Sequence, residues 1–349
     1  MSSPDTGAVA AVAGERRDLL ARLLRDAGEM APADRIEELT QLEGGWSRFS
    51  HVARLSGEDG AQRRYVVRVK APFGLFDTDL VAEYNVFVGL QDLDLPTPRV
   101  FGLHETVDNP FGGELFVMEY LSGRSANVWR ARDHVALRED WEGSRGIARD
   151  VVTYAARIHA VGPDHAPAGL PTVRFADQVE RWRREYQDAG FNRDPILEEA
   201  FQWLVEHAPA EARTGLVHGD YRIGNMLMEG GRVSAILDWE LAYMGDVRFD
   251  LGYIATEYIA GKHLRPKTTL LGGVAEREWF FAEYERATGE PVDREAVRAF
   301  SVLGLASLMT MSYTGLRRYV DGSSTDFRRA WARYGLPGMR QELTALMAW

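Results

Sequence analysis

The chain has 349 residues, of which 45% are hydrophobic and 27% charged, and this composition is typical of a folded globular protein with one large or two smaller cores. Its net charge of −11 lacks the basic surplus that binding to nucleic-acid phosphates requires, so we expect no nucleic-acid partner. The absence of cysteine excludes disulfides, thiolate zinc sites and a cysteine nucleophile.

Neither the start of the sequence nor its longest apolar stretch predicts export or membrane insertion. The start has no basic region ahead of its small side chains, as a secretory signal would. The nearly apolar stretch at residues 301–313 is shorter than the ~20 residues that a helix needs to cross a bilayer. We therefore expect a cytoplasmic protein with no membrane partner, and the oligomeric state cannot be derived from the sequence.

The N-terminal part of the chain is predicted to be a helix followed by a β-rich region. Apolar side chains repeat at helical spacing within residues 7–26 and again within residues 77–88, where Asp77 can cap the helix. Short runs of apolar and β-branched residues, separated by turn-rich pieces, predict five strands. These strands are expected at residues 36–42, 49–55, 64–70, 98–103 and 115–120.

After Gly123 the pattern becomes mainly helical, with one β-rich interruption between Leu216 and Asp238. The predicted helices are at residues 144–160, 195–207, 249–260, 276–287, 292–314 and 325–334. Strands with one helix, followed by a helical half, predict an α+β fold of two lobes, a small β-rich N-lobe and a larger helical C-lobe. We expect an N-terminal segment and helix at 1–30, an N-lobe at 31–120 and a C-lobe at 121–349.

The β-rich interruption contains the residues that carry chemistry. An apolar strand leads into HGDYRIGN (residues 218–225), a stretch of small and polar residues. Two short apolar runs on either side of Gly230-Gly231 follow and predict a β-hairpin. Because hairpin strands are antiparallel, Asn225 before the first strand and Asp238 after the second come to the same open end, beside Asp220.

These side chains suit phosphoryl transfer. Carboxylate and amide oxygens are ligands for a hard cation such as Mg²⁺, which keeps water or substrate phosphate in its other positions. Metal ions must offset the charge of the transferred group, and a carboxylate must orient the attacking hydroxyl and accept its proton. We expect Asp220 in the second role and Asn225 and Asp238 in the first. Taken singly, Asp220 and Asn225 would be ordinary turn residues, and the hairpin spacing is what favours a site.

Two other classes of function fit parts of this pattern. A metal-dependent hydrolase could use His218, Asp220 and Asp238, but such sites recruit several histidines, and the other seven are scattered without an HxH or HExxH pair. A catalytically inactive, kinase-shaped binding module would have lost Asp220, Asn225 or Asp238, and all three are present.

The two motifs together resemble those of the aminoglycoside phosphotransferase family, a branch of the protein-kinase-like fold. The spacing of His218, Asp220 and Asn225 matches the family's catalytic loop, and Asp238-Trp239-Glu240 matches its metal-binding segment. The resemblance extends in element order over about residues 35–315. The sequence HGDYRIGNML…ILDWE is most similar to the motifs of the branch that includes kinase domains attached to acyl-CoA-dehydrogenase-like proteins.

The resemblance implies roles for several residues of the C-lobe. Asp220 would be the catalytic base, and Asn225 and Asp238 would hold Mg²⁺. Asp250 would match the family's buried aspartate that braces the catalytic loop, while a helix N-cap is a compatible alternative. In this fold His218 is more often a structural hydrogen-bonding residue than a proton shuttle.

A kinase also needs a glycine-bearing loop over the phosphates. Gly44, Gly45 and Ser47, between the first two predicted strands, could supply it, although a Gly-Gly turn alone is a weak signal. The family usually has Asn where Arg48 stands, which puts contacts of the loop in doubt but not the chemistry. Arg222, two residues after Asp220, is either a group that neutralises the transferring phosphate or a surface arginine.

A cation on a strand and an acid that holds it complete the expected phosphate contacts. Arg68 and Lys70 project to the same face of the predicted strand at 64–70. The family's pattern favours Arg68, which we prefer, a kinase-like V-x-x-K pattern favours Lys70, and an exposed strand could carry both for solubility. Glu83 stands where the family has the partner of the cation, and the alternative is a solvated helical Glu.

We therefore predict an ATP- and Mg²⁺-dependent phosphotransferase that moves the γ-phosphate to a hydroxyl of a small molecule. By resemblance, the backbone of the hinge residues Glu119, Tyr120 and Leu121 would bind adenine. The acceptor depends on the helical lobe, where Glu257 and Tyr258 are either pocket residues or surface and core residues. A hydroxyacyl thioester, an aminoglycoside, a macrolide and another small alcohol all remain open as acceptors.

Overall fold

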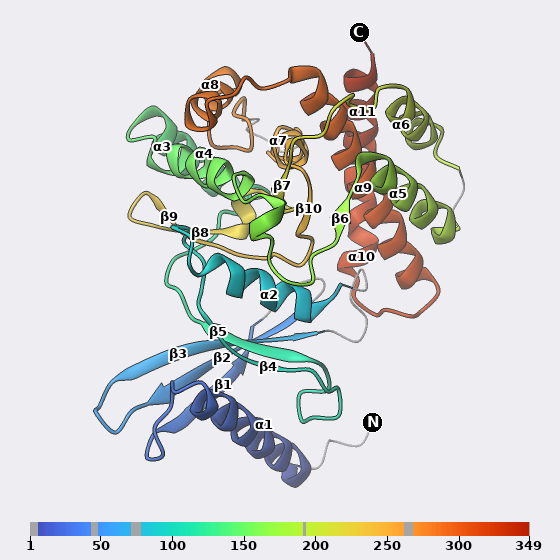
Figure 1. Ribbon diagram of the computed structural model, residues 1–349. Coiled ribbons are helices and arrows are strands. Elements are labelled where there is room, and N and C mark those ends of the chain that lie inside the picture. Colours follow the sequence, from blue (N-terminus) through green and yellow to red (C-terminus); the bar gives the residue numbers. More distant parts are fainter. Residues whose placement is uncertain (1–5, 43–47, 71–77, 191–192, 262–267, 349) are drawn as a thin grey trace. The chain divides into compact units, whose positions relative to one another are not determined.

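A computed structural model describes residues 6–42, 48–70, 78–190, 193–261 and 268–348, which form two compact units (Figure 1). The first unit comprises Met1–Asp92 and Thr97–Leu121, and the second comprises Leu93–Pro96 and Ser122–Trp349. The predicted loop residues Gly44, Gly45 and Ser47 lie outside the described residues.

The first unit contains a five-stranded antiparallel sheet with the order β1-β2-β3-β5-β4. Its strands are β1 (Arg35–Gln41), β2 (Arg48–Ser56), β3 (Gln62–Lys70), β4 (Val100–His104) and β5 (Leu115–Glu119). All five predicted strands are present. Strands β2 and β3 pair along their whole length, from Arg48 opposite Lys70 to Ser56 opposite Gln62.

Helices α1 (Thr6–Asp26) and α2 (Leu80–Leu90) cover opposite faces of this sheet (Figure 1). Successive strand residues point to opposite faces, so on β3 Val67 and Val69 join the core beneath α1, while Arg68 points to the side of α2. The core beneath α1 is apolar and also contains Leu19, Leu20, Leu24, Ala53, Leu55, Phe111, Leu115 and Val117. The sheet thus separates an apolar core from a face that carries charged residues.

Helix α2 begins after Asp79 and not at the predicted cap, Asp77. The Asp79 side chain accepts hydrogen bonds from the backbone N–H groups of Val81 and Ala82, as an N-cap residue does. Asp77 lies outside the described residues. Two aspartates precede the apolar residues of this helix, and the sequence pattern did not distinguish between them.

The second unit is mainly helical, and several of its helices pack around α9 (Arg294–Val320) (Figure 1). The helices against α9 are α5 (Phe175–Ala189), α6 (Pro195–Glu206), α7 (Arg248–Ile254), α10 (Arg328–Trp331) and α11 (Leu336–Met347). Helices α3 (Ala131–Glu142), α4 (Gly146–His159) and α8 (Arg277–Thr288) pack beside one another. A β-rich unit and a helical unit confirm the predicted α+β fold.

Among the described helices, only α9 is long and apolar enough to cross a bilayer by length and composition. Its most apolar window has a mean hydropathy of 1.3, and 78% of that window is buried inside the protein. Phe300, Leu303 and Met309 are fully buried. The apolar composition of α9 is therefore what a central helix of this unit requires.

The helical unit contains more elements than the sequence pattern predicts. Helices α3, α5 and α11 were not expected, α9 continues beyond the predicted end at residue 314, and α7 ends before residue 260. Helices α3 and α5 are rich in charged residues, and the sequence analysis did not recognise the apolar stripe that each of them buries.

The β structure of the second unit also extends beyond residues 216–238. A three-stranded sheet has the order β6-β10-β7, and β8 pairs with β9 in a separate two-stranded sheet. These strands are β6 (Thr172–Val173), β7 (Thr214–Val217), β8 (Met226–Glu229), β9 (Arg232–Ile236) and β10 (Tyr243–Asp246). The prediction of a single β-rich interruption was therefore wrong, because β6 and β10 are too short to show a period.

Candidate catalytic site

The predicted hairpin is present and joins the two ends of the motif. Gly230 and Gly231 connect β8 and β9 with φ angles of 59° and 75°. Positive φ at both central residues is the requirement of a type I′ turn, which glycine meets without strain. At the open end, the backbone N–H of Leu237 donates to the carbonyl of Asn225 at 2.8 Å. Asp238 therefore follows directly on the residue that pairs with Asn225.

The carboxylate of Asp220 is held by donors from two residues. Arg222 Nε donates to Oδ1 at 2.9 Å, and Asn225 Nδ2 donates to Oδ2 at 2.6 Å. Asn225 Nδ2 also donates to the Asp220 carbonyl at 3.0 Å. The Asp220 side chain is 17% exposed. The loop thus fixes one partly accessible carboxylate in a defined orientation.

Asp250 anchors the backbone of this loop from within α7. Its fully buried carboxylate accepts the N–H groups of His218 at 2.8 Å and Gly219 at 3.0 Å. His159 Nε2 lies 3.1 Å from the same carboxylate, and His159 Nδ1 lies 2.8 Å from the hydroxyl of Tyr284. Helix α7 begins two residues before Asp250, which therefore is not its N-cap.

His218 uses both of its ring nitrogens inside the protein. Nδ1 accepts the backbone N–H of Asp220 at 3.2 Å, and Nε2 donates to the carbonyl of Leu237 at 3.0 Å. The residue is fully buried, and its ring centroid lies 4.5 Å from that of Trp239. These contacts require a neutral ring protonated at Nε2, so neither nitrogen can ligate a metal or shuttle a proton in this arrangement.

Asn225 and Asp238 fit a Mg²⁺ site that substrate phosphate would complete. The Nδ2 of Asn225 is committed to Asp220, so its side-chain oxygen is the atom left for a cation. Asp238 has a φ of 69°, a left-handed conformation that is uncommon for residues other than glycine and concentrates at functional sites. Among the described residues, no group of three or more His, Cys, Asp or Glu could hold a metal. Two oxygen ligands plus phosphate are what Mg²⁺ normally takes.

Arg222 lies beside Asp220 rather than free on the surface. Its side chain is 33% exposed. Burial opposes its charge, but Asp220, Tyr253 and Asp238 together outweigh burial and raise the pKa of Arg222. Burial, reinforced by Asp220, raises the pKa of Tyr253, and burial raises that of Tyr258. A charged guanidinium and the protonated Tyr253 therefore lie close to the carboxylate, and Tyr258 lies close to the guanidinium.

In the first unit, the side chain of Glu83 on α2 joins two arginines of the sheet. Arg68 Nη2 on β3 lies 2.8 Å from Glu83 Oε1, and Arg48 Nε on β2 lies 3.1 Å from Oε2. Glu83 is 1% exposed, Arg48 5% and Arg68 9%, so the cluster is buried. Glu83 is therefore not a solvated helical residue. A charged cluster at this depth holds its side chains in fixed positions.

Lys70 has a different partner. Its Nζ lies 3.6 Å from the carboxylate of Glu114, and both side chains are partly exposed. At the end of β5, the N–H of Glu119 donates to the backbone carbonyl of Arg99, and the N–H of Tyr120 donates to that of Arg64. The guanidinium of Arg64 also stacks on the Tyr120 ring, 3.9 Å from its centroid.

Sequence reasoning missed two contributors to these sites. His159 was counted among scattered histidines, yet it supports Asp250 across 91 positions of sequence. Arg48 was read as a departure from the family, yet it binds Glu83. The pairing of β2 with β3 explains the position of Arg48, because Ser50 opposite Arg68 places Arg48 on the same face of the sheet. No sequence signal connected His159 with Asp250.

Fold and site together define a phosphotransferase with a protein-kinase-like fold. The model of the Phosphotransferase enzyme family matches residues 38–300, and the chain belongs to this family.

Curated relatives confirm the predicted branch. The chain is 28% identical over 305 residues to the probable acyl-CoA dehydrogenase IBR3 of Arabidopsis thaliana, covering 78% of this chain and 35% of that protein. It is 27% identical over 327 residues to acyl-CoA dehydrogenase family member 10 of Mus musculus, covering 89% and 29% respectively. The chain therefore spans about a third of the length of these relatives.

Solved structures share the fold over nearly the whole chain. A Ralstonia eutropha protein whose name places it among the aminoglycoside phosphotransferases aligns with a TM-score of 0.71 at 22% identity, covering 95% of this chain and 97% of the other. The macrolide 2′-phosphotransferase of Brachybacterium faecium aligns with a TM-score of 0.55 at 20% identity, covering 95% and 98%. An aminoglycoside phosphotransferase in complex with ADP and hygromycin B aligns with a TM-score of 0.56 at 17% identity, covering 95% and 97%.

Proposed function

We propose that the protein is an ATP- and Mg²⁺-dependent O-phosphotransferase that transfers the γ-phosphate to a hydroxyl of a small molecule, with Asp220 as the base. The observation that carries the proposal is the Asp220 carboxylate, held between Arg222 and Asn225 on a loop that Asp250 anchors. A fixed carboxylate next to oxygen ligands for a cation is what phosphoryl transfer to a hydroxyl requires.

In the proposed step, Asp220 orients the acceptor hydroxyl and takes its proton while the acceptor oxygen forms a bond to the γ-phosphorus. The bond between that phosphorus and the β–γ bridging oxygen breaks, which leaves ADP and a phosphate monoester. Mg²⁺ held by Asn225 and Asp238 would offset the negative charge of the phosphates. Once Asp220 is protonated, its ion pair with Arg222 weakens, and the guanidinium becomes available to the oxygens of the transferring group.

The nucleotide contacts are assigned to the first unit. We propose Arg68 as the phosphate-binding cation, because its pairing with buried Glu83 is the arrangement that such a cation needs, whereas Lys70 pairs with Glu114. At the hinge, the N–H groups of Glu119 and Tyr120 already donate to the backbone carbonyls of Arg99 and Arg64. A donor to adenine would accordingly come from the N–H of Leu121.

The first acceptor to test follows from the curated relatives. The names of the curated relatives refer to acyl-CoA dehydrogenases. A hydroxyacyl thioester is therefore the first acceptor to test, ahead of a macrolide, an aminoglycoside and simpler alcohols.

An ATP-consumption screen across these acceptor classes, with Mg²⁺ present, tests the proposal. Replacing Asp220 by Ala should lower turnover about a thousandfold while ATP affinity stays within a few-fold, because a base contributes to the chemical step and little to nucleotide binding. Asp164→Ala, at an exposed position, is the matched control and should retain activity. Wild-type turnover in Asp220→Ala would refute the assignment of the base, and hydrolysis of phosphate esters without ATP would favour a hydrolase.

A further inference from the structure

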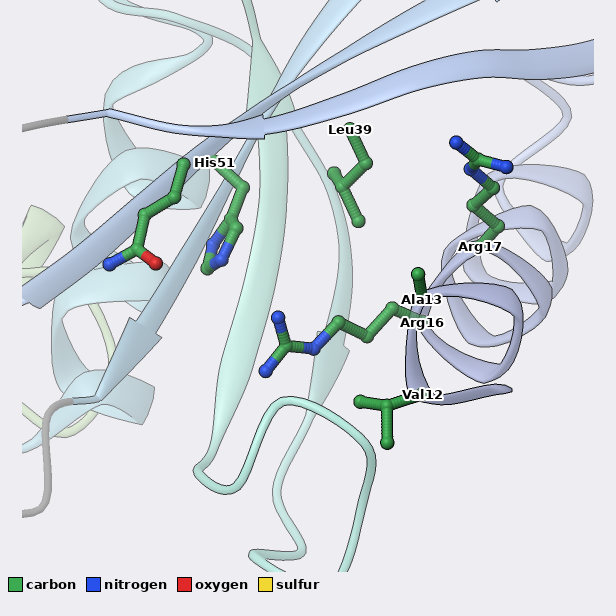
Figure 2. A pocket seen from close by; sticks show the side chains of 7 residues that line it. Val12, Ala13, Arg16, Arg17, Leu39 and His51 are labelled. Atoms are coloured by element: carbon green, nitrogen blue, oxygen red, sulfur yellow. The ribbon is translucent and has the colours of Figure 1, made fainter. Parts of the chain in front are cut away.

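A pocket of about 500 Å³ lies in the first unit, between α1 and strands β1 and β2. Its volume is within the range of roughly 300–1,000 Å³ that is typical of small-molecule sites. Figure 2 labels six lining residues: Val12, Ala13, Arg16, Arg17, Leu39 and His51. His51 and Arg48 are three positions apart on β2 and point to opposite faces of the sheet. The pocket is therefore separate from the Arg48–Glu83–Arg68 cluster.

The lining of this pocket combines positive charge with apolar surface. Arg16 and Arg17 contribute two guanidinium groups, and none of the lining residues is acidic. Among the described residues, no carboxylate forms an ion pair with either arginine. Val12, Ala13 and Leu39 supply an apolar wall. In a protein with a net charge of −11, such a local surplus of positive charge selects for an anion.

Arg16 is held so that part of its guanidinium remains available to a ligand. Its Nε donates to the carbonyl of Pro110 at 2.8 Å, and its guanidinium lies 5.3 Å from the ring centroid of Phe111. Figure 2 shows the side chain extending from α1 toward the part of the pocket where His51 lies. With Nε committed, the two terminal amino groups form a planar pair of donors, the geometry that binds a carboxylate.

His51 supplies a buried polar group to the pocket. It is 6% exposed, and its Nδ1 is buried without a hydrogen-bond partner among the described residues. Its ring lies edge-on to Phe111, with the centroids 5.4 Å apart. Burial, together with Arg16, lowers the pKa of His51 to about 4, so the ring is neutral at pH 7. A buried polar atom without a partner is satisfied when a ligand atom occupies the adjacent space.

We propose that this pocket binds a small organic carboxylate, with the carboxylate on Arg16, a polar contact to His51, and an aliphatic or aromatic body against Val12, Ala13 and Leu39. This site lies outside the proposed catalytic machinery, and the inference does not depend on the proposed reaction. It concerns a ligand that the protein binds without converting it.

Titration calorimetry of the full chain with octanoate and with phenylacetate tests the site, because the two probes differ in their body and share the carboxylate. We expect saturable one-to-one binding of at least one probe. Replacing Arg16 by Met should weaken it about tenfold or more, since a charge-assisted hydrogen bond is lost. Arg22→Met is the matched control, because Arg22 is exposed on the same helix and does not line the pocket, and it should bind as the wild type does.

Two further measurements separate the proposed site from other sources of binding. His51→Phe replaces the polar ring with an apolar one and should also weaken the binding of octanoate. Saturating ATP should not displace octanoate from the wild-type protein. Octyl phosphate and 1-octanol, which keep the chain and replace the carboxylate, should bind more weakly. Absence of binding by both carboxylates, unchanged affinity in Arg16→Met, displacement by ATP, or tighter binding of octyl phosphate would each overturn the proposal. If the protein proved to have no kinase activity, these binding results would still stand.

Discussion

Among the described residues, the most deeply buried carboxylate of each unit is stabilised in a different way. Asp250, 0% exposed, accepts two backbone N–H groups and contacts an imidazole. Glu83, 1% exposed, contacts two guanidinium groups. Asp250 therefore fixes the backbone of a loop, whereas Glu83 fixes the side chains of two cations.

Asp250 acts through hydrogen bonds to the backbone, whereas Glu83 acts through ion pairs with side chains. The two backbone donors to Asp250 belong to adjacent residues of one loop, so they act as one unit and neither can replace the other. The two arginines around Glu83 come from different strands, so the loss of one leaves the other in place. The protein should thus be far more sensitive to changes at Asp250 than to changes at a single arginine of the Glu83 cluster.

Asp250→Ala is expected to have the largest effect. The substitution leaves the buried N–H groups of His218 and Gly219 and the ring of His159 without an acceptor, which should lower the free energy of unfolding by about 3–5 kcal/mol. Urea unfolding followed by circular dichroism measures this change. Asp250→Asn keeps one acceptor oxygen and should be affected less, and a loss below about 1 kcal/mol in the Ala variant would contradict the proposed anchoring.

His51 adds a third kind of buried polar group, one that is neutral and can be charged only at low pH. Its pKa is about 4 in the folded protein and about 6.5 when unfolded, so between these values the unfolded chain binds a proton that the folded protein does not. Acid therefore favours unfolding, and this residue should remove up to about 3 kcal/mol of stability as pH falls from 6.5 to 4. In His51→Phe, urea midpoints measured over that range should fall less steeply than in the wild type. Parallel pH profiles would refute the depressed pKa.

Arg68→Met and Lys70→Met form a matched pair that tests which cation contacts the nucleotide. Loss of a cation that binds the phosphates should raise the Kd for ATP about tenfold to a hundredfold, the magnitude of a lost charge-assisted contact. We expect this change for Arg68, which pairs with Glu83, and a change of about twofold or less for Lys70, which pairs with partly exposed Glu114. Calorimetric ATP titrations measure both, and the opposite order would transfer the role to Lys70.

The parts of the molecule that the sequence predicted well are local in the chain. The hairpin is encoded by two short apolar runs around Gly230-Gly231, and its antiparallel pairing brings together the residues at its ends. The five strands of the first unit are bounded by turn-rich segments in the same way. Here, a few neighbouring residues determine both the backbone conformation and the placement of the side chains.

The parts that escaped prediction depend on contacts between distant segments. His159 reaches Asp250 only because α4 packs in the same unit as α7, and spacing along the chain does not encode this contact. Arg48 lies on β2 while its partner Glu83 lies on α2, so the ion pair needed the tertiary fold to be seen.

Arg48→Asn introduces the residue that the family resemblance implies at this position and should have the smallest effect. Glu83 keeps its 2.8 Å contact with Arg68, so its carboxylate does not become an unpaired buried charge. We expect the free energy of unfolding to change by about 1 kcal/mol or less and the Kd for ATP to rise less than in Arg68→Met. The double variant Arg48→Asn with Arg68→Met removes both contacts and should lose more stability than the sum of the single losses, because Glu83 is then buried with neither arginine. Additive losses would show that the two arginines do not share the support of Glu83.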